Sequence, residues 1–379
     1  MTDTSRIPFN RPCQAGRELE YLRASLASGH MSGDGPFSER CHRLLEEVLG
    51  TRALLTTSCT HALELAALLL EIGPEDEVVL PSFTFVSTAN AFALRGARLR
   101  FVDIREDTLN LDETLLGDAF SERTRAVVPV HYAGVGCDMD RIGELAGRRG
   151  IAVVEDNAHG LFGRYRGRWL GTFGRLATLS FHETKNFSCG EGGALLVNDP
   201  SLVERAEVLR EKGTNRKLYF RGGTDRYTWI DLGSSYLPAD LLAAYLLAQL
   251  EARESIRAAR KRVFGTYRLG LADWAMREDV RLPVVPPECE PSYHMFHLLL
   301  PTAELQPRFI THLAARGIAS VFHYQPLHCS PFGLRYGHRQ GQLPITESVS
   351  GRLVRLPFYN DLDSGALARI VAAVGSFRC

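Results

Sequence analysis

The stretch Ser180-Phe181-His182-Glu183-Thr184-Lys185-Asn186, followed by Gly190-Glu191-Gly192-Gly193, is the most informative part of the chain. It places Lys185 on a polar turn between an apolar run, Leu176 to Phe181, and a glycine-rich segment. A short apolar run bounded by turn residues predicts a strand. A lysine at the end of such a strand can reach into a cleft and form a Schiff base with an aldehyde.

A carboxylate that could act with this lysine lies upstream, in Val153-Val154-Glu155-Asp156-Asn157-Ala158-His159. Asp156 ends an apolar run, and ligands bind at strand ends in open α/β sheets. Taken alone, Lys185 could be a solvated surface lysine and Asp156 a helix cap. Together they match pyridoxal phosphate chemistry, which needs a lysine for the aldehyde and a carboxylate for the pyridine nitrogen. Lys185 and Asp156 are therefore the predicted catalytic residues.

Two further segments fit the same cofactor. Ser58, Cys59 and Thr60 open a predicted helix over 62–70, where free backbone N–H groups can hold a phosphate. Ser180 could add a second phosphate contact. Phe85 follows another apolar strand and could stack on a flat ring. An ordinary helix cap and an ordinary core aromatic remain the alternative explanations for these two segments.

Composition indicates a soluble globular enzyme. The 379 residues favour two domains, and hydrophobic and charged contents of 45% and 23% are unexceptional. Lys+Arg and Asp+Glu both number 44, so neither a nucleic-acid partner nor a membrane surface is expected. No apolar leader or membrane span is predicted. The eight cysteines show no metal-binding spacing, so we expect no metal and a reducing, cytoplasmic location.

Strand-like and helical patterns alternate over the first 250 residues, which predicts an α/β fold with a mostly parallel sheet flanked by helices. We expect a large domain over 1–250, a small C-terminal α+β domain over 251–379, and a long linking helix at about 239–274. In the small domain, 293–300 and 318–321 are predicted strands. In the large domain, the predicted strands are 77–81, 98–103, 126–131, 151–155, 177–181 and 194–197.

Many segments across nearly the whole chain resemble the DegT-type sugar aminotransferases, which are fold-type I pyridoxal phosphate enzymes. The likeness is most specific in His-x-x-Lys-Asn and Gly-Glu-Gly-Gly, within residues 181–193. The other matching segments are Ile7-Pro8-Phe9-Asn10, Gly33-Asp34-Gly35-Pro36-Phe37, Val130-His131-Tyr132-Ala133-Gly134, Arg210-Glu211-Lys212-Gly213-Thr214-Asn215-Arg216, Gly233-Ser234-Ser235-Tyr236-Leu237 and Val321-Phe322-His323-Tyr324-Gln325-Pro326-Leu327-His328.

The resemblance assigns roles residue by residue. Lys185 matches the Schiff-base lysine, and Asp156 the partner of the pyridine nitrogen. The remaining matches are Phe85 for ring stacking, Ser58, Cys59, Thr60 and Ser180 for the phosphate, His159 near the phenolic oxygen, Ser235 for the phosphate of a neighbouring subunit, and His323 and Tyr324 for the sugar. Ser235 stands where many members have a longer asparagine, so its reach is in question. The shared site implies a homodimer.

The resemblance further implies amino transfer from L-glutamate to a nucleotide-linked keto sugar. The nearest likeness is to members that aminate C4 of dTDP-4-keto-6-deoxy-D-glucose, giving dTDP-4-amino-4,6-dideoxy-D-galactose for a surface polysaccharide such as lipopolysaccharide. A 3-keto sugar or a ketocyclitol acceptor stays open, because the motifs bind the cofactor and not the acceptor. Related dehydratases replace the lysine with histidine, so Lys185 argues against dehydration. A non-catalytic regulatory homologue is the remaining alternative.

Overall fold

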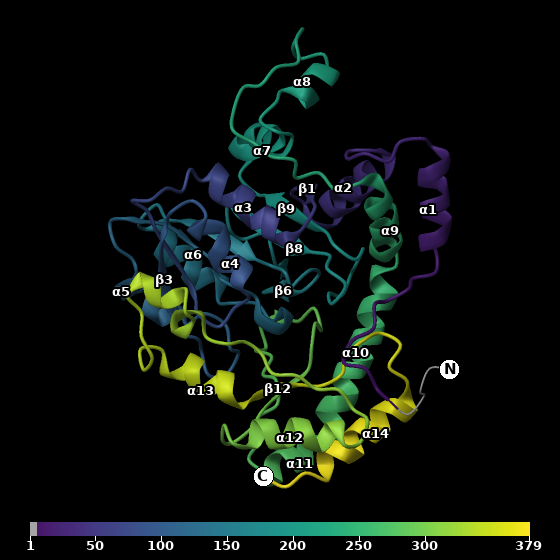
Figure 1. The fold of residues 1–379 in the computed structure, drawn as a ribbon, viewed down its shortest axis with the longest axis vertical. Coiled ribbons are helices and arrows are strands. Elements are labelled where there is room, and N and C mark those ends of the chain that lie inside the picture. Colours follow the sequence, from purple (N-terminus) through teal and green to yellow (C-terminus); the bar gives the residue numbers. More distant parts are fainter. Residues whose placement is uncertain (1–5) are drawn as a thin grey trace.

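A seven-stranded sheet forms the centre of the larger part of the molecule (Figure 1). The computed structural model describes residues 6–379. The strands are β1 (Arg52–Thr56), β2 (Glu77–Pro81), β3 (Arg98–Val102), β4 (Thr124–Val127), β5 (Ala152–Asp156), β8 (Leu176–Ser180) and β9 (Gly193–Val197). Their order is β1-β9-β8-β5-β4-β2-β3. Strand β9 runs antiparallel to both neighbours and the other pairs are parallel, which confirms the predicted mostly parallel sheet.

Helices cover both faces of this sheet. The helices of this part of the chain are α1 (Glu18–Ala27), α2 (Pro36–Leu49), α3 (Cys59–Leu69), α4 (Val86–Ala93), α5 (Leu116–Ala119), α6 (Met139–Gly147), α7 (Val203–Arg210), α8 (Arg216–Phe220) and α9 (Asp240–Glu251). Helix α8 alone projects away from the sheet, next to α7 (Figure 1). Successive strand residues point to opposite faces. Leu54 accordingly packs with α3, α4 and α7, whereas Ala53 and Leu55 pack with α2 and α9. The sheet is thus buried on both sides, as its apolar strands predict.

A second hydrophobic core lies in the C-terminal part of the chain. It is built from α10 (Arg253–Gly270), α11 (Ala272–Arg277), α12 (Leu305–Ala314), α14 (Ser364–Gly375) and the antiparallel pair β11 (His297–Leu299) and β12 (Leu353–Arg355). Helix α13 (Pro344–Arg352) precedes β12. Ile7 joins this core and exchanges backbone hydrogen bonds with Gly317 and Ala319. The N-terminal segment therefore packs with the C-terminal core, although the domain limits themselves stay a prediction.

The remaining elements are short. A three-stranded sheet contains β6 (Arg164–Tyr165), β7 (Arg168–Trp169) and β10 (Cys289–Glu290). The single-turn 3₁₀ helices are η1 (Glu113–Leu115), η2 (Tyr132–Gly134), η3 (Pro200–Leu202), η4 (Leu327–Cys329) and η5 (Gly333–Tyr336). Helix η1 continues directly into α5.

Two sequence-based expectations need correction. The predicted helix over 239–274 is divided into α9, α10 and α11 by Ala252 and Leu271, whose ψ angles of 11° and −4° leave the helical range. On the two sides of Ala252, α9 packs on α1 and α2, and α10 packs on α14. The sequence did not predict the break because a single non-helical residue leaves the spacing of the apolar residues intact. Residues 318–321 form no named strand. Single bridges from Ile318 to Ile7 and from Val321 to Arg355 tie them to the C-terminal core.

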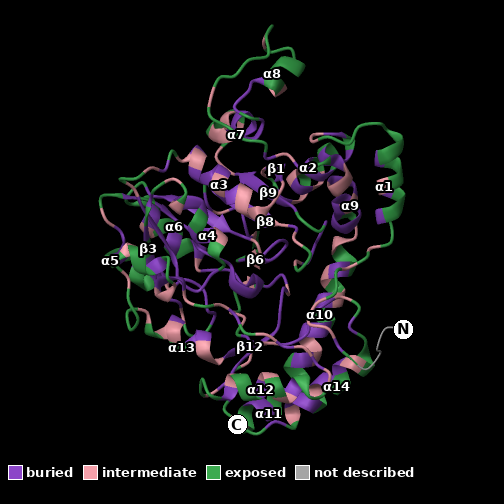
Figure 2. Cartoon of the chain, viewed as in Figure 1, coloured by how far each residue is buried: buried purple, intermediate pink, exposed green. Residues whose placement is uncertain are grey.

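The ends of β1, β2, β5 and β8 meet at one edge of the sheet, above the C-terminal core (Figure 1). Carboxyl ends of parallel strands form the usual ligand-binding edge. Most residues of the sheet are buried, except on the edge strand β3, whereas α8 and the outer face of α1 are exposed (Figure 2). All eight cysteines are unpaired. Within residues 6–379, no helix combines the length and apolar character needed to cross a membrane.

Candidate active site

A pocket of about 730 Å³ opens at this sheet edge, between the strand ends and the C-terminal core. Ten of the eleven predicted site residues line it. They are Ser58, Cys59, Thr60, Phe85, Asp156, His159, Ser180, Lys185, His323 and Tyr324. They come from four strand ends and from the segment after Val321, so the fold brings together residues that are far apart in the sequence.

Lys185 lies on the turn after β8, only partly accessible to solvent. Its backbone N–H donates to His182 O at 2.9 Å and closes this turn. Burial in the pocket lowers the pKa of the Lys185 amine from 10.5 to about 8, while Cys59 and Asp156 oppose the shift. An amine with this pKa is partly uncharged near neutrality, as a nucleophile or a proton-transfer group requires.

Asp156 is the last residue of β5, and its carboxylate is held from two sides. Thr88 Oγ1 donates to Oδ2 at 2.7 Å, and the Ala158 N–H donates to Oδ1 at 3.1 Å. Since Thr88 gives its proton to Asp156, Thr84 Oγ1, 2.8 Å away, must donate to Thr88. The Thr88 hydroxyl and the Ala158 N–H together fix the orientation of the carboxylate. Sequence reasoning missed both threonines, because neither carries a motif of its own.

The start of α3 has the features of a phosphate site. Ser58 caps the helix, and its Oγ and carbonyl O accept from the N–H groups of His61 and Ala62. The first four N–H groups of a helix lack intrahelical partners. Those of Cys59 and Thr60 are therefore left for a ligand, at the positive end of the helix dipole.

Gly193 brings β9 against this helix start. It pairs with Thr56 on one side and with Ser180 on the other. A Cβ on Gly193 would lie 2.4 Å from Cys59 N and 2.5 Å from Ser58 O, far inside contact distance. The last glycine of the Gly-Glu-Gly-Gly motif thus allows the backbone of β9 to lie against the backbone at the start of α3.

Three imidazoles lie close together in the wall of the pocket. His159 and His294 stack with centroids 4.2 Å apart, and His323 Nδ1 lies 2.9 Å from Tyr132 OH. Burial lowers the pKa of all three well below 6.5, so they are neutral at pH 7. His294 Nδ1 lies 2.9 Å from Asn186 Oδ1, and His294 also lines the pocket.

The aromatic residues of the pocket lie at its mouth and along its wall. Phe85 is 56% exposed and lines the opening, with its ring centroid 6.4 Å from that of Tyr324. A ring in this position is open to contact with a flat ligand. Arg355 also lines the pocket and had no signal in the sequence analysis.

Ser235 does not reach this pocket. It is exposed and pairs with Glu211 through a single backbone bridge. The neighbouring-subunit contact predicted for it therefore stays a prediction. Asp34, from the motif at 33–37, also lies outside the pocket and forms an ion pair with buried Arg210 at 2.5 Å.

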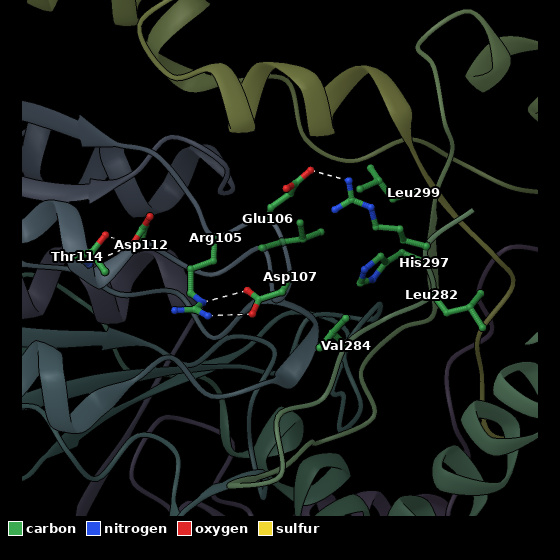
Figure 3. Close-up of a pocket in the computed structure, with 11 residues that line it drawn as sticks. Arg105, Glu106, Asp107, Asp112, Thr114, Leu282, Val284, His297 and Leu299 are labelled. Atoms are coloured by element: carbon green, nitrogen blue, oxygen red, sulfur yellow. Dashed lines mark hydrogen bonds and ion pairs between the residues drawn. The ribbon is translucent and has the colours of Figure 1, made fainter. Parts of the chain in front are cut away.

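A second cavity, of about 440 Å³, lies between residues 105–114 and 281–299 (Figure 3). Both of its arginines are engaged in ion pairs, and Asp112 accepts hydrogen bonds from Thr114. Arg105 pairs with Asp107 at 2.8 Å, and Arg281 pairs with Glu106 at 2.6 Å. It contains none of the predicted site residues, so it is not the candidate active site.

One cluster combines residue types that bind metals. His328 Nε2 lies 3.0 Å from Glu347 Oε1 and 3.2 Å from Cys329 Sγ. His328 Nδ1 also lies 2.7 Å from Ser82 Oγ. These hydrogen bonds account for the cluster as a link between η4, α13 and the end of β2. The expectation of no metal stays a prediction.

Comparison with known proteins agrees with this geometry. Residues 12–375 match the DegT/DnrJ/EryC1/StrS aminotransferase family. The chain is 31% identical to the uncharacterized protein MJ1066 of Methanocaldococcus jannaschii, covering 99% of this chain and 98% of the relative. DesV of S. venezuelae, solved with a ketimine intermediate, superposes with a TM-score of 0.88 at 33% identity over 98% of both chains. TlmJ, an aminotransferase from Streptoalloteichus hindustanus, superposes with a TM-score of 0.89 at 31% identity over 98% of both chains.

The donor set fits the cofactor of that family. Helix-start N–H groups and hydroxyls suit a phosphate, Asp156 suits a protonated ring nitrogen, and Lys185 suits an aldehyde. The chain belongs to the DegT/DnrJ/EryC1/StrS family of pyridoxal-phosphate-dependent sugar aminotransferases.

Proposed function

We propose that this protein transfers the amino group of L-glutamate to a nucleotide-linked keto sugar. The acceptor we propose, from the nearest likeness within the family, is dTDP-4-keto-6-deoxy-D-glucose, aminated at C4 to dTDP-4-amino-4,6-dideoxy-D-galactose. The observation that carries the proposal is the meeting of Lys185, Asp156 and the Ser58–Thr60 helix start in one pocket. The likeness of residues 321–328 to dTDP-4-amino-4,6-dideoxygalactose transaminases supports the choice of acceptor.

Pyridoxal phosphate, when bound, supplies the electron sink for the carbanion formed next to the amino group. Lys185 holds its aldehyde and, once released, moves the proton on the carbon that gains or loses the amino group. The lowered pKa of this amine suits it to act as both acid and base. Asp156, fixed by Thr88, keeps the ring nitrogen protonated.

The remaining site residues would hold and orient the cofactor and the sugar. Ser58, Cys59, Thr60 and Ser180 would bind the phosphate, and Phe85 would stack on the ring. His159 would be the neighbour of the phenolic oxygen, and His323 and Tyr324 would contact the sugar. Because the three imidazoles of this wall are neutral, they offer hydrogen bonds to hydroxyl groups without adding charge.

A homodimer with shared sites is part of the proposal. Residues 216–232 project from the body of the chain at α8 (Figure 1) and expose several large apolar side chains. These are Phe220, Tyr227, Trp229, Ile230 and Leu232, from 53% to 75% exposed. A projecting apolar surface of this kind indicates an interface. The unpaired cysteines also suit a reducing, cytoplasmic compartment.

The acceptor is tested by offering the holoprotein L-glutamate and a panel of acceptors, with the product identified by NMR. The panel contains nucleotide-linked 4-keto sugars, nucleotide-linked 3-keto sugars and free ketocyclitols. We expect turnover with the dTDP-linked 4-keto sugar and an amine at C4. Turnover confined to ketocyclitols would contradict the nucleotide-sugar proposal, and turnover confined to 3-keto sugars would move the amine to C3.

A further inference from the structure

Arg355 is a cation of the candidate active site that has no acidic partner. It ends β12, and its side chain lines the pocket beside His323 and Tyr324. Its guanidinium lies over the ring of Phe9, with 4.8 Å from Cζ to the centroid. Nε is buried without a hydrogen-bond partner, and no ion pair joins Arg355 to another residue between 6 and 379.

Arg210 and Arg260, the two arginines classed as buried within residues 6–379, are given acceptors by the chain. Arg210 donates to Asp34 and to Leu55 O. Arg260 donates to the carbonyls of Tyr293 and His294 and to Asn360. Removing a guanidinium from water without an acceptor is costly. The free guanidinium of Arg355 therefore indicates a ligand that supplies the missing acceptors.

The charges around Arg355 favour an anionic ligand. Two carboxylates line the pocket. Asp156 is engaged by Thr88, and Glu191 is 69% exposed beside His182. The imidazoles near Arg355 are neutral at pH 7, whereas an arginine stays charged. The substrate side of the pocket therefore carries an uncompensated positive charge.

We propose that Arg355 binds the α-carboxylate of the amino donor, an inference that rests on the proposed aminotransferase function. A planar guanidinium pairs with a planar carboxylate through two parallel hydrogen bonds. Arg355 and Lys185 line the same pocket. The α-carboxylate is attached to the carbon whose proton moves, whereas the diphosphate of a sugar nucleotide is separated from C4 by the sugar ring. An anion site near Lys185 thus fits the donor.

The test separates the two half-reactions in the holoenzyme and in Arg355→Met, Arg355→Lys and Arg352→Met. Arg352 ends α13 outside the pocket and is the matched control. The change in cofactor absorbance on adding L-glutamate without acceptor reports the donor half. The reverse change, after loading with pyridoxamine phosphate and adding dTDP-4-keto-6-deoxy-D-glucose, reports the acceptor half. Calorimetric binding of glutarate, which cannot react, gives a readout independent of turnover.

For Arg355→Met we expect the half-saturating L-glutamate concentration to rise about 100-fold, as for the loss of one buried charge pair. Glutarate binding should weaken in parallel, and the acceptor half should change less than twofold. The half-saturating L-glutamate concentration of Arg355→Lys should lie between those of the wild type and Arg355→Met. That of Arg352→Met should match the wild type. L-Isoglutamine, whose α-carboxylate is an amide, should react equally poorly with the wild type and Arg355→Met, whereas L-glutamine should retain the Arg355 effect.

Three outcomes would overturn the inference. The first is an unchanged half-saturating L-glutamate concentration in Arg355→Met. The second is a loss of rate confined to the acceptor half-reaction, which would indicate that Arg355 binds the nucleotide phosphate. The third is a difference between the wild type and Arg355→Met that persists with L-isoglutamine. If Arg355→Met fails to retain the cofactor, Arg355→Lys decides by the same measures. Absence of any absorbance change in the wild type with amino donors would instead contradict the proposed function itself.

Discussion

Thr88 Oγ1 donates a 2.7 Å hydrogen bond to Oδ2 of Asp156, and both residues are buried. Thr88 belongs to α4 and Asp156 ends β5, so the packing of this helix on the sheet orients the carboxylate. In its turn Thr84 orients Thr88. The orientation of the Asp156 carboxylate thus depends on two hydroxyls, one on α4 and one just before it.

Replacing Thr88 with valine keeps the shape and removes the donor. A hydrogen bond to a charged group contributes about 1.5–3 kcal/mol, so kcat should fall about tenfold or more. The cofactor should also titrate at a lower pH, because a less firmly held carboxylate stabilises the protonated ring nitrogen less. Absorbance titration and steady-state kinetics measure both. Thr84→Val removes a hydroxyl that contacts Asp156 only through Thr88, so it should lower kcat less. An equal loss of kcat in Thr84→Val and Thr88→Val would contradict this order of hydrogen bonds.

Gly193→Ala should disrupt the cradle by steric contact. Its Cβ would fall 2.4–2.5 Å from the Ser58–Cys59 backbone, which cannot rotate away. We expect a loss of about 1–3 kcal/mol in the free energy of unfolding by urea, with weaker cofactor binding. Gly143→Ala is the control, because that helical position is open and should gain about 0.5–1 kcal/mol. Equal stability of the two variants would refute the packing role of Gly193.

The pKa of Lys185 predicts a pH profile. Burial lowers this pKa from 10.5 to about 8, so the Lys185 amine of the apoprotein becomes half neutral at about pH 8. Covalent capture of pyridoxal phosphate, followed by stopped-flow absorbance, should therefore rise with pH and level off above about 8. Asp156 raises this pKa and Arg355 lowers it. The midpoint should then move down in Asp156→Asn and up in Arg355→Met, and shifts of the opposite sign would contradict the electrostatics.

The same pKa shift has a consequence for stability. A lysine whose folded pKa lies below its unfolded value binds fewer protons when folded, between pH 8 and 10.5. The contribution of Lys185 to the free energy of unfolding should therefore rise with pH across this interval. Comparison of the apoprotein with Lys185→Met by urea unfolding isolates this contribution. Parallel pH curves for the two proteins would contradict the shift.

The exposed segment at 216–232 gives a prediction for assembly. Trp229 is 75% exposed there, and aromatic residues of this kind commonly dominate interfaces. Trp229→Glu should weaken the proposed dimer at least tenfold, measured by sedimentation equilibrium. Leu269→Glu, at an 83% exposed position of α10, should leave assembly unchanged. A wild-type monomer at all concentrations would contradict the shared site.

Local sequence predicted the parts of the site that lie at strand ends. Lys185, Asp156 and Ser58 each follow a recognisable apolar run, so pattern and order alone were sufficient. Thr88 and Arg355 were missed because each lies within a regular element and becomes relevant only through packing. Thr88 is 68 residues from the carboxylate it contacts. The break at Ala252 was missed for a different reason, since a single non-helical residue leaves the apolar period intact.

The account depends most on Lys185 as the residue that holds the cofactor. Borohydride reduction of the holoprotein, followed by proteolysis and mass spectrometry, fixes the cofactor to the amine that carries it. We predict a single pyridoxyl group on Lys185, and none in Lys185→Ala, which should also lack transaminase activity. A pyridoxyl group on another lysine, or full activity in Lys185→Ala, would contradict the account.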